Sequence, residues 1–186
     1  MKKRLLFYQK RIRVLFLEQL YYNMNEEISD LPDWDDEKLV PIDDLSEAWK
    51  PSASRDACKL MYKHWQSLVY ILKALLLPII EDNNLVDESL KDRAEDLLQT
   101  SLVIGLKIRT SETEGLYIFR MENAAVVRKL ALDIDTTIPL FTGQKNIDKS
   151  YIDAIHKEID DFRKLFIIWI NTFEKDEFKD EWGLFI

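Results

Sequence analysis

The chain has 186 residues, of which 47% are hydrophobic and 32% are charged, and its formal net charge is −8. This composition is typical of one soluble globular domain and excludes a disordered chain. The negative charge argues against general nucleic-acid binding, which needs a cationic surface to displace counterions. A single cysteine, Cys58, excludes an internal disulfide and is compatible with a reducing cytoplasm, where we expect the protein to reside.

Glycine is scarce, with only four in the chain, and each stands alone. A loop that cradles phosphate usually needs glycines, because its backbone approaches the ligand closely. Apolar residues instead recur at helical spacing through most of the chain. We therefore expect an all-α fold, an up-down helical bundle of four core helices plus a peripheral helix, in a single domain over residues 1–186.

The first predicted helix covers about residues 3–28 and has two apolar faces at 3–4 spacing. A surface helix needs only one such face, so the second requires a cover, either another chain or the loop that follows. The basic start of this segment precedes an apolar run that is too short for an export signal. Its basic residues are expected to pair with the acidic segment that comes next.

Residues 29–55 form a long acidic crossover with eight acidic and three basic side chains. Two tryptophans, Trp34 and Trp49, and several aliphatic residues make it too apolar for a free linker. We expect an ordered segment laid over the bundle. Loops of this length in compact domains are often functional.

Four more helices are predicted: over about residues 54–80, over 88–109, from a capping box at 111–114 to about 137, and over 148–173. Asp87 is a plausible N-cap, and Ser111-Glu112-Thr113-Glu114 is typical of a capping box that starts the fourth helix after a tight turn. The inward positions that the spacing predicts are Cys58, Met61, Trp65, Leu68, Leu72, Leu75 and Ile79 in the first of these; Leu90, Ala94, Leu97, Ser101, Ile104 and Ile108 in the next; Leu116, Phe119, Asn123, Val127, Leu130 and Ile134 in the third; and Ile152, Ile155, Ile159, Phe162, Phe166, Trp169 and Phe173 in the last.

Several polar residues lie on or beside these inward stripes. Asn123 and Ser101 are central on theirs, and the flanking positions are Arg120, His64, His156 and Arg163. A buried polar group without a partner costs about 1–3 kcal/mol, so these residues should either form one closed network or line an interhelical cleft. In a cleft, the two arginines could hold a carboxylate or a phosphate.

Metal or cofactor chemistry has little support in the sequence. Helical di-iron sites use Glu-x-x-His on facing helices, and the nearest match, Asp153-Ala-Ile-His156, occurs once. The acidic runs over 33–37 and 174–177 are typical of solvated surface. We expect no metal, no cofactor and no catalytic residue.

The tail over residues 174–186 is acidic up to Glu181 and then apolar. Trp182, Leu184 and Phe185 are expected to dock into an apolar groove, on their own bundle or on a second copy, because exposure of so much apolar surface is unfavourable. We therefore expect a non-catalytic interaction protein that self-associates or binds a protein partner, with no role at a membrane. The alternative is an anion-binding or enzymatic site lined by Arg120, Asn123, His156 and Arg163.

Overall fold

A computed structural model of the chain describes residues 30–35, 52–82, 87–113, 115–144, 147–177 and 182–184. The chain divides into two compact units, Met1–Pro32 and Asp33–Ile186, and every helix named below belongs to the second. The helix expected over 3–28 and residues 36–51 of the acidic crossover lie outside the described residues. The single domain over 1–186 and the ordered crossover therefore stay predictions.

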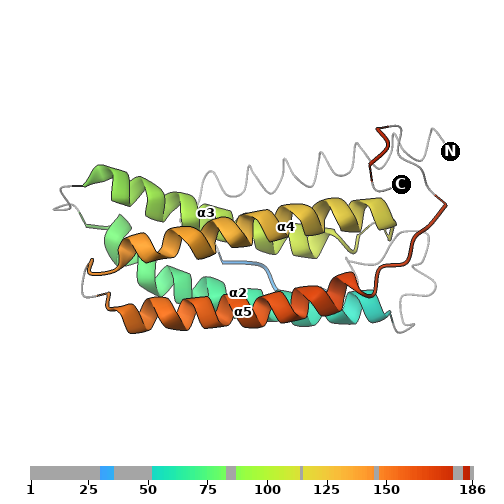
Figure 1. Cartoon of the computed structure of the whole chain (residues 1–186), viewed down its shortest axis with the longest axis horizontal. Coiled ribbons are helices and arrows are strands. Elements are labelled where there is room, and N and C mark those ends of the chain that lie inside the picture. The colour runs from blue at the N-terminus through green and yellow to red at the C-terminus, as the bar shows by residue number, and fades with distance from the viewer. Residues whose placement is uncertain are drawn as a thin grey trace. The chain divides into compact units, whose positions relative to one another are not determined.

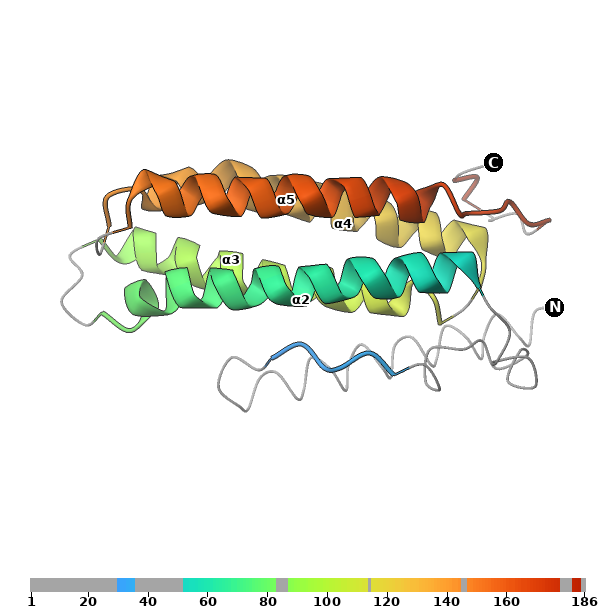
Figure 2. The ribbon, with the colours of Figure 1, turned by 90° about the horizontal axis from the view of Figure 1, so that it is seen from below.

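All regular structure in the described residues is helical. The elements are α2 (Ala53–Ile80), α3 (Glu88–Thr110), α4 (Tyr117–Thr137), the short 3-10 helix η2 (Ile138–Phe141) and α5 (Lys149–Ile170). The four long helices lie side by side, and no strand occurs in the described part of the chain, which confirms the all-α prediction (Figures 1 and 2). Within the same residues, no helix is long and apolar enough to cross a membrane.

Polar side chains cap three of these helices. Ser52 accepts a hydrogen bond from the backbone N–H of Arg55 at the start of α2, Asp87 caps α3 as predicted, and Asp148 caps α5. Each cap satisfies a backbone donor that has no partner within the first turn of its helix. These local signals place the starts of three helices within a residue or two of their predicted positions.

The core lies between all four long helices, and aromatic rings from α2 and α5 meet in it. Trp65 packs against Phe162 with 4.6 Å between ring centroids, and its indole N–H donates to the carbonyl oxygen of Ser101 at 2.8 Å. Trp65 and Trp169 are both fully buried. The predicted inward stripes of α2 and α3 are buried, as is that of α5 up to Trp169, although α5 ends at Ile170 and leaves Phe173 beyond it.

The inward face of α4 differs from the prediction. Phe119, Asn123 and Leu130 are half-buried rather than central in the core. The buried residues of this helix are Ile118, Ala124, Val127, Ala131 and Ile134. Arg120 points inward to an ion pair, and because residues three apart differ by about 60° around a helix, this rotation moves Asn123 to the flank. The expected burial of Asn123 was therefore wrong.

The predicted capping box is also wrong, although a turn does join α3 to α4. Ser111 follows α3 as its C-cap, and its hydroxyl donates back to the carbonyl oxygen of Ile108. Helix α4 begins only at Tyr117, after Leu116, whose side chain makes no cap. A capping box would direct the Glu112 carboxylate to a nearby backbone N–H. The carboxylate instead accepts hydrogen bonds from the side chains of other helices.

Candidate functional site

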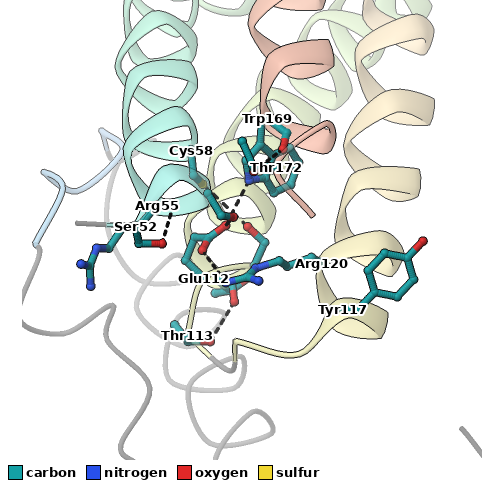
Figure 3. Close-up of polar contacts among 12 residues, drawn as sticks. Ser52, Arg55, Cys58, Glu112, Thr113, Tyr117, Arg120, Trp169 and Thr172 are labelled. Atoms are coloured by element: carbon teal, nitrogen blue, oxygen red, sulfur yellow. Dashed lines mark hydrogen bonds and ion pairs between the residues drawn. The ribbon is translucent and has the colours of Figure 1, made fainter. Parts of the chain in front are cut away.

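The most deeply buried charged side chain among the described residues is Glu112, in the turn after α3, which is 2% exposed. Its Oε1 accepts hydrogen bonds from the Ser54 hydroxyl at 2.7 Å and from the indole N–H of Trp169 at 3.0 Å. Its Oε2 accepts from the Arg120 guanidinium at 3.0 Å. Figure 3 shows Arg120 and Trp169 approaching the Glu112 carboxylate from different helices.

Four segments distant in sequence meet at this carboxylate. Ser54 lies in the first turn of α2, Arg120 in the first turn of α4, and Trp169 in the last turn of α5. The two helix N-termini add partial positive charge, which favours an anion. Removal of a carboxylate from water is costly unless it is paired and hydrogen-bonded, and here both oxygens have donors. Glu112 therefore joins α2, α4 and α5 at one end of the described helices. We call Glu112 and its three donors, Ser54, Arg120 and Trp169, the Glu112 clasp.

The thiol of Cys58 lies beside this clasp and is fully buried, as predicted. It donates to the carbonyl oxygen of Ile108 at 3.3 Å and lies 3.7 Å from the Ser111 hydroxyl. Burial, and then the negative charge of Glu112, raise the pKa of the Cys58 thiol well above its ordinary value. Cys58 therefore stays protonated at neutral pH, which removes the nucleophilic form.

Arg120 is the one predicted site residue that belongs to the clasp. Its side chain is 15% exposed, and its guanidinium already binds the internal carboxylate of Glu112. An incoming anion would have to displace Glu112 and leave that carboxylate buried without its charge partner. The guanidinium of Arg120 is thus already paired with an internal anion, although its buried Nε has no hydrogen-bond partner.

His156 and Arg163 belong to a second group, around Asp135 on α4. The His156 Nδ1 lies 2.6 Å from Asp135 Oδ1, and Arg163 reaches Asp135 Oδ2 at 3.9 Å. Arg163, with its side chain 57% exposed, also pairs with Asp160 at 2.9 Å. Asp135 and Arg120 are 15 residues apart on α4, which corresponds to about 22 Å along the helix. The four residues of the predicted cleft therefore do not converge.

The remaining predicted residues are separate from both groups. His64 donates from Nε2 to the carbonyl oxygen of Glu158 at 2.9 Å, between α2 and α5. Ser101 is buried, and its hydroxyl donates to the carbonyl oxygen of Leu98 at 2.6 Å. No three His, Cys, Asp or Glu side chains within the described residues gather as a metal site would require.

The segment after α5 returns to the start of α4. Phe173 packs edge-on against Trp169 with centroids 4.8 Å apart, and Asp176 accepts a hydrogen bond from the backbone N–H of Tyr117 at 2.8 Å. Asp176 therefore supplies the N-terminal cap that Leu116 cannot. No sequence pattern predicts this cap, because the two residues are 59 positions apart.

The two terminal apolar residues that the structure describes, Trp182 and Leu184, are exposed. Trp182 is 89% exposed and Leu184 is 52% exposed, whereas Phe185 lies outside the described residues. Their docking on the same chain finds no support here, and docking on a second copy stays a prediction.

The outer surface of α2 carries a feature that the sequence analysis missed. Six positions at alternating spacings of four and three residues face outward, and none is Lys, Arg, Asp or Glu. We call this set the α2 stripe: Leu60, His64, Ser67, Ile71, Ala74 and Pro78. All are exposed except His64, which is half-buried, and Leu60 and Ile71 are 55% and 40% exposed. Spacing of this kind is typical of the contact seam between packed helices.

Comparison with known proteins gave no match, because no family model, curated protein or solved structure is significantly similar to the chain.

Proposed function

We propose that this chain is a non-catalytic interaction protein, an up-and-down helical bundle that binds a protein partner through the α2 stripe. The observation that carries the proposal is the stripe itself, a run of uncharged side chains at helix-packing spacing. Its members are exposed within the described residues, except for the half-buried His64, which contacts Glu158. If a partner buries a large apolar side chain of the stripe, that burial contributes about 1.5–3 kcal/mol to the free energy of binding. Residues at the same spacing on the inward face of α2 form its core contacts.

The buried polar residues support the same proposal. The Glu112 clasp is occupied by its own donors, and the Asp135 group lies far from it on α4. The alternative, an anion-binding or enzymatic cleft between Arg120, Asn123, His156 and Arg163, needs these side chains in one place. Their contacts do not favour that arrangement.

The proposal can be tested by photo-crosslinking in the cells that make the protein. A photoreactive phenylalanine analogue replaces Ser67 in the stripe, and in a matched variant it replaces Gln99. Both positions are exposed, and both lie within long helices. We expect irradiation to give a discrete covalent adduct from position 67 and none from position 99.

The mass of the adduct identifies the partner class. An adduct with any single protein supports an interaction surface on α2. The absence of an adduct at position 67, or equal labelling at positions 67 and 99, would overturn the proposal.

A further inference from the structure

We infer that residues 173–177 form a strap that opens and closes over the Glu112 clasp while the four long helices stay folded. The strap runs from the end of α5 to the start of α4, within the same compact unit as these helices. Figure 3 shows Tyr117, at the start of α4, and Trp169, near the end of α5, at the same end of the helices as Glu112. This inference is independent of the α2 stripe and of its partner.

The strap begins in a turn that is fixed to the end of α5. The Thr172 hydroxyl donates to the carbonyl oxygen of Trp169 at 2.6 Å, and the backbone N–H of Phe173 donates to the carbonyl oxygen of Ile170 at 3.2 Å. The Phe173 ring packs edge-on against the Trp169 ring, with 4.8 Å between centroids. This end of the strap is therefore attached to α5 through the backbone and sets an aromatic ring against Trp169.

The far end of the strap attaches to α4 through the side chains of Asp176 and Lys175. Asp176 accepts a hydrogen bond from the backbone N–H of Tyr117 at 2.8 Å, and Lys175 Nζ lies 5.9 Å from the centroid of the Tyr117 ring. A carboxylate at the start of a helix also interacts favourably with the helix dipole. Both side chains are exposed, so water competes for these contacts.

The strap opens more readily than the helices because it contributes no residue to the core. None of residues 171–177 is buried, and residues 174–177 are all exposed. The helices that the strap joins bury their inward side chains, such as Val127 in α4 and Phe162 in α5. Segments with little buried apolar surface open at a much lower free energy than the core. Opening of the strap therefore leaves α4 and α5 in place.

Opening changes the surroundings of the clasp. The indole N–H of Trp169 donates to Glu112 Oε1 at 3.0 Å, and Trp169 is fully buried with Phe173 against its ring. When the strap opens, Phe173 moves away from Trp169 and water reaches the indole N–H. A buried ion pair, such as that of Glu112 with Arg120, is screened less than an exposed one. The strap thus controls how strongly the clasp is hydrated.

Two N–H groups report the strap directly. Tyr117 is the first residue of α4, so its backbone N–H has no acceptor within the helix and is bound by Asp176. The second group is the indole N–H of Trp169, whose NMR signal is assigned with Trp169→Phe. Hydrogen exchange of both groups is measured by NMR in the full chain under native conditions. The backbone N–H of Val127, in the core of α4, is the reference for unfolding of the helices.

We expect the Tyr117 and Trp169 groups to be less protected from exchange than the Val127 amide, each relative to its own unprotected rate. Low urea concentrations should speed exchange at Val127 and leave the other two unchanged, because opening of the strap exposes little surface. Asp176→Ala should speed exchange at both Tyr117 and Trp169 by about five- to ten-fold, as the loss of one N-cap implies. Glu177→Ala, at the next exposed position, should change neither.

Equal protection of all three groups, with equal dependence on urea, would show that the strap opens only when the helices unfold, and overturns the inference. A Tyr117 N–H that exchanges at its unprotected rate in the parent chain overturns the closed strap. An indole exchange rate that is unchanged in Asp176→Ala overturns control of the clasp by the strap.

Discussion

At the scale of single residues, Glu112 is the buried carboxylate that joins α2, α4 and α5. Glu112→Ala leaves the Arg120 guanidinium, the Ser54 hydroxyl and the Trp169 indole without their acceptor. We expect the free energy of unfolding to fall by about 3–5 kcal/mol, because this change breaks a buried ion pair. Urea denaturation measures the loss.

Glu158→Ala is the matched control, since Glu158 pairs with His64 but is 35% exposed. Its cost should stay within about 1 kcal/mol, as for other exposed pairs. The double variant Glu112→Ala/Arg120→Ala should lose less stability than the sum of the two single changes, because neither charge is then left alone. Full additivity, or a Glu112→Ala variant as stable as the parent chain, contradicts the clasp.

Two buried acids predict how stability depends on alkaline pH. Burial raises the pKa of Tyr62 from 10.0 to about 12, and raises that of Cys58 well above 9.0. Each group is neutral in the folded chain at pH values where the unfolded chain ionises it. Their contribution to stability is therefore complete below about pH 9 and is lost as the pH rises from there toward 12.

The urea midpoint should accordingly fall between pH 9 and pH 11, and Tyr62→Phe should show a shallower fall because it removes one of the two acids. Parallel pH profiles for the parent chain and Tyr62→Phe would show that Tyr62 ionises equally in both states.

At the scale of helices, α4 receives its N-terminal cap from a distant segment. Asp176→Ala removes the acceptor for the Tyr117 backbone N–H, and we expect a loss of about 1 kcal/mol, typical of a lost N-cap. Glu177→Ala, one residue later and exposed, should change little. Thermal unfolding compares the two variants, and equal melting temperatures would exclude the cap.

The helices also differ in how well they could be predicted from sequence. The inward faces of α2 and α5 follow from large apolar and aromatic residues at 3–4 spacing, such as Trp65 and Phe162. In α4 the buried positions include Ala124 and Ala131, whose small side chains give a weak signal, whereas the more apolar Leu130 lies at the edge. In this rotation Arg120 reaches Glu112, a contact between a helix and a turn that a single-helix pattern does not contain.

The candidate site was less predictable for the same reason. Glu112 lies in a turn, where helical spacing has no meaning, and its local pattern favours a capping box. Two of its three donors, Ser54 and Trp169, are 58 and 57 positions away in the sequence. The α2 stripe, by contrast, could have been found in the sequence, because its six uncharged positions follow a seven-residue repeat. It was missed because the inward stripe of the same helix is more apolar and gives the stronger pattern.

At the scale of the whole molecule, the helices are clasped at one end by a closed polar cluster, and an uncharged stripe remains on the outside. Closed polar clusters fix how helices pack, whereas exposed apolar surface in a soluble chain is typical of a contact site. We propose that buried polar side chains such as Glu112 stabilise the fold, and that the outer face of α2 binds a partner.

Photo-crosslinking from position 67 tests this claim most directly. We expect a discrete covalent adduct heavier than the 22.1 kDa of one chain. Ile71→Glu should abolish this adduct with unchanged helicity, while Leu132→Glu on α4, at a residue 50% exposed, should keep it. A parent chain that gives no adduct, or an Ile71→Glu variant that gives the same adduct as the parent chain, would contradict a partner site on the outer face of α2.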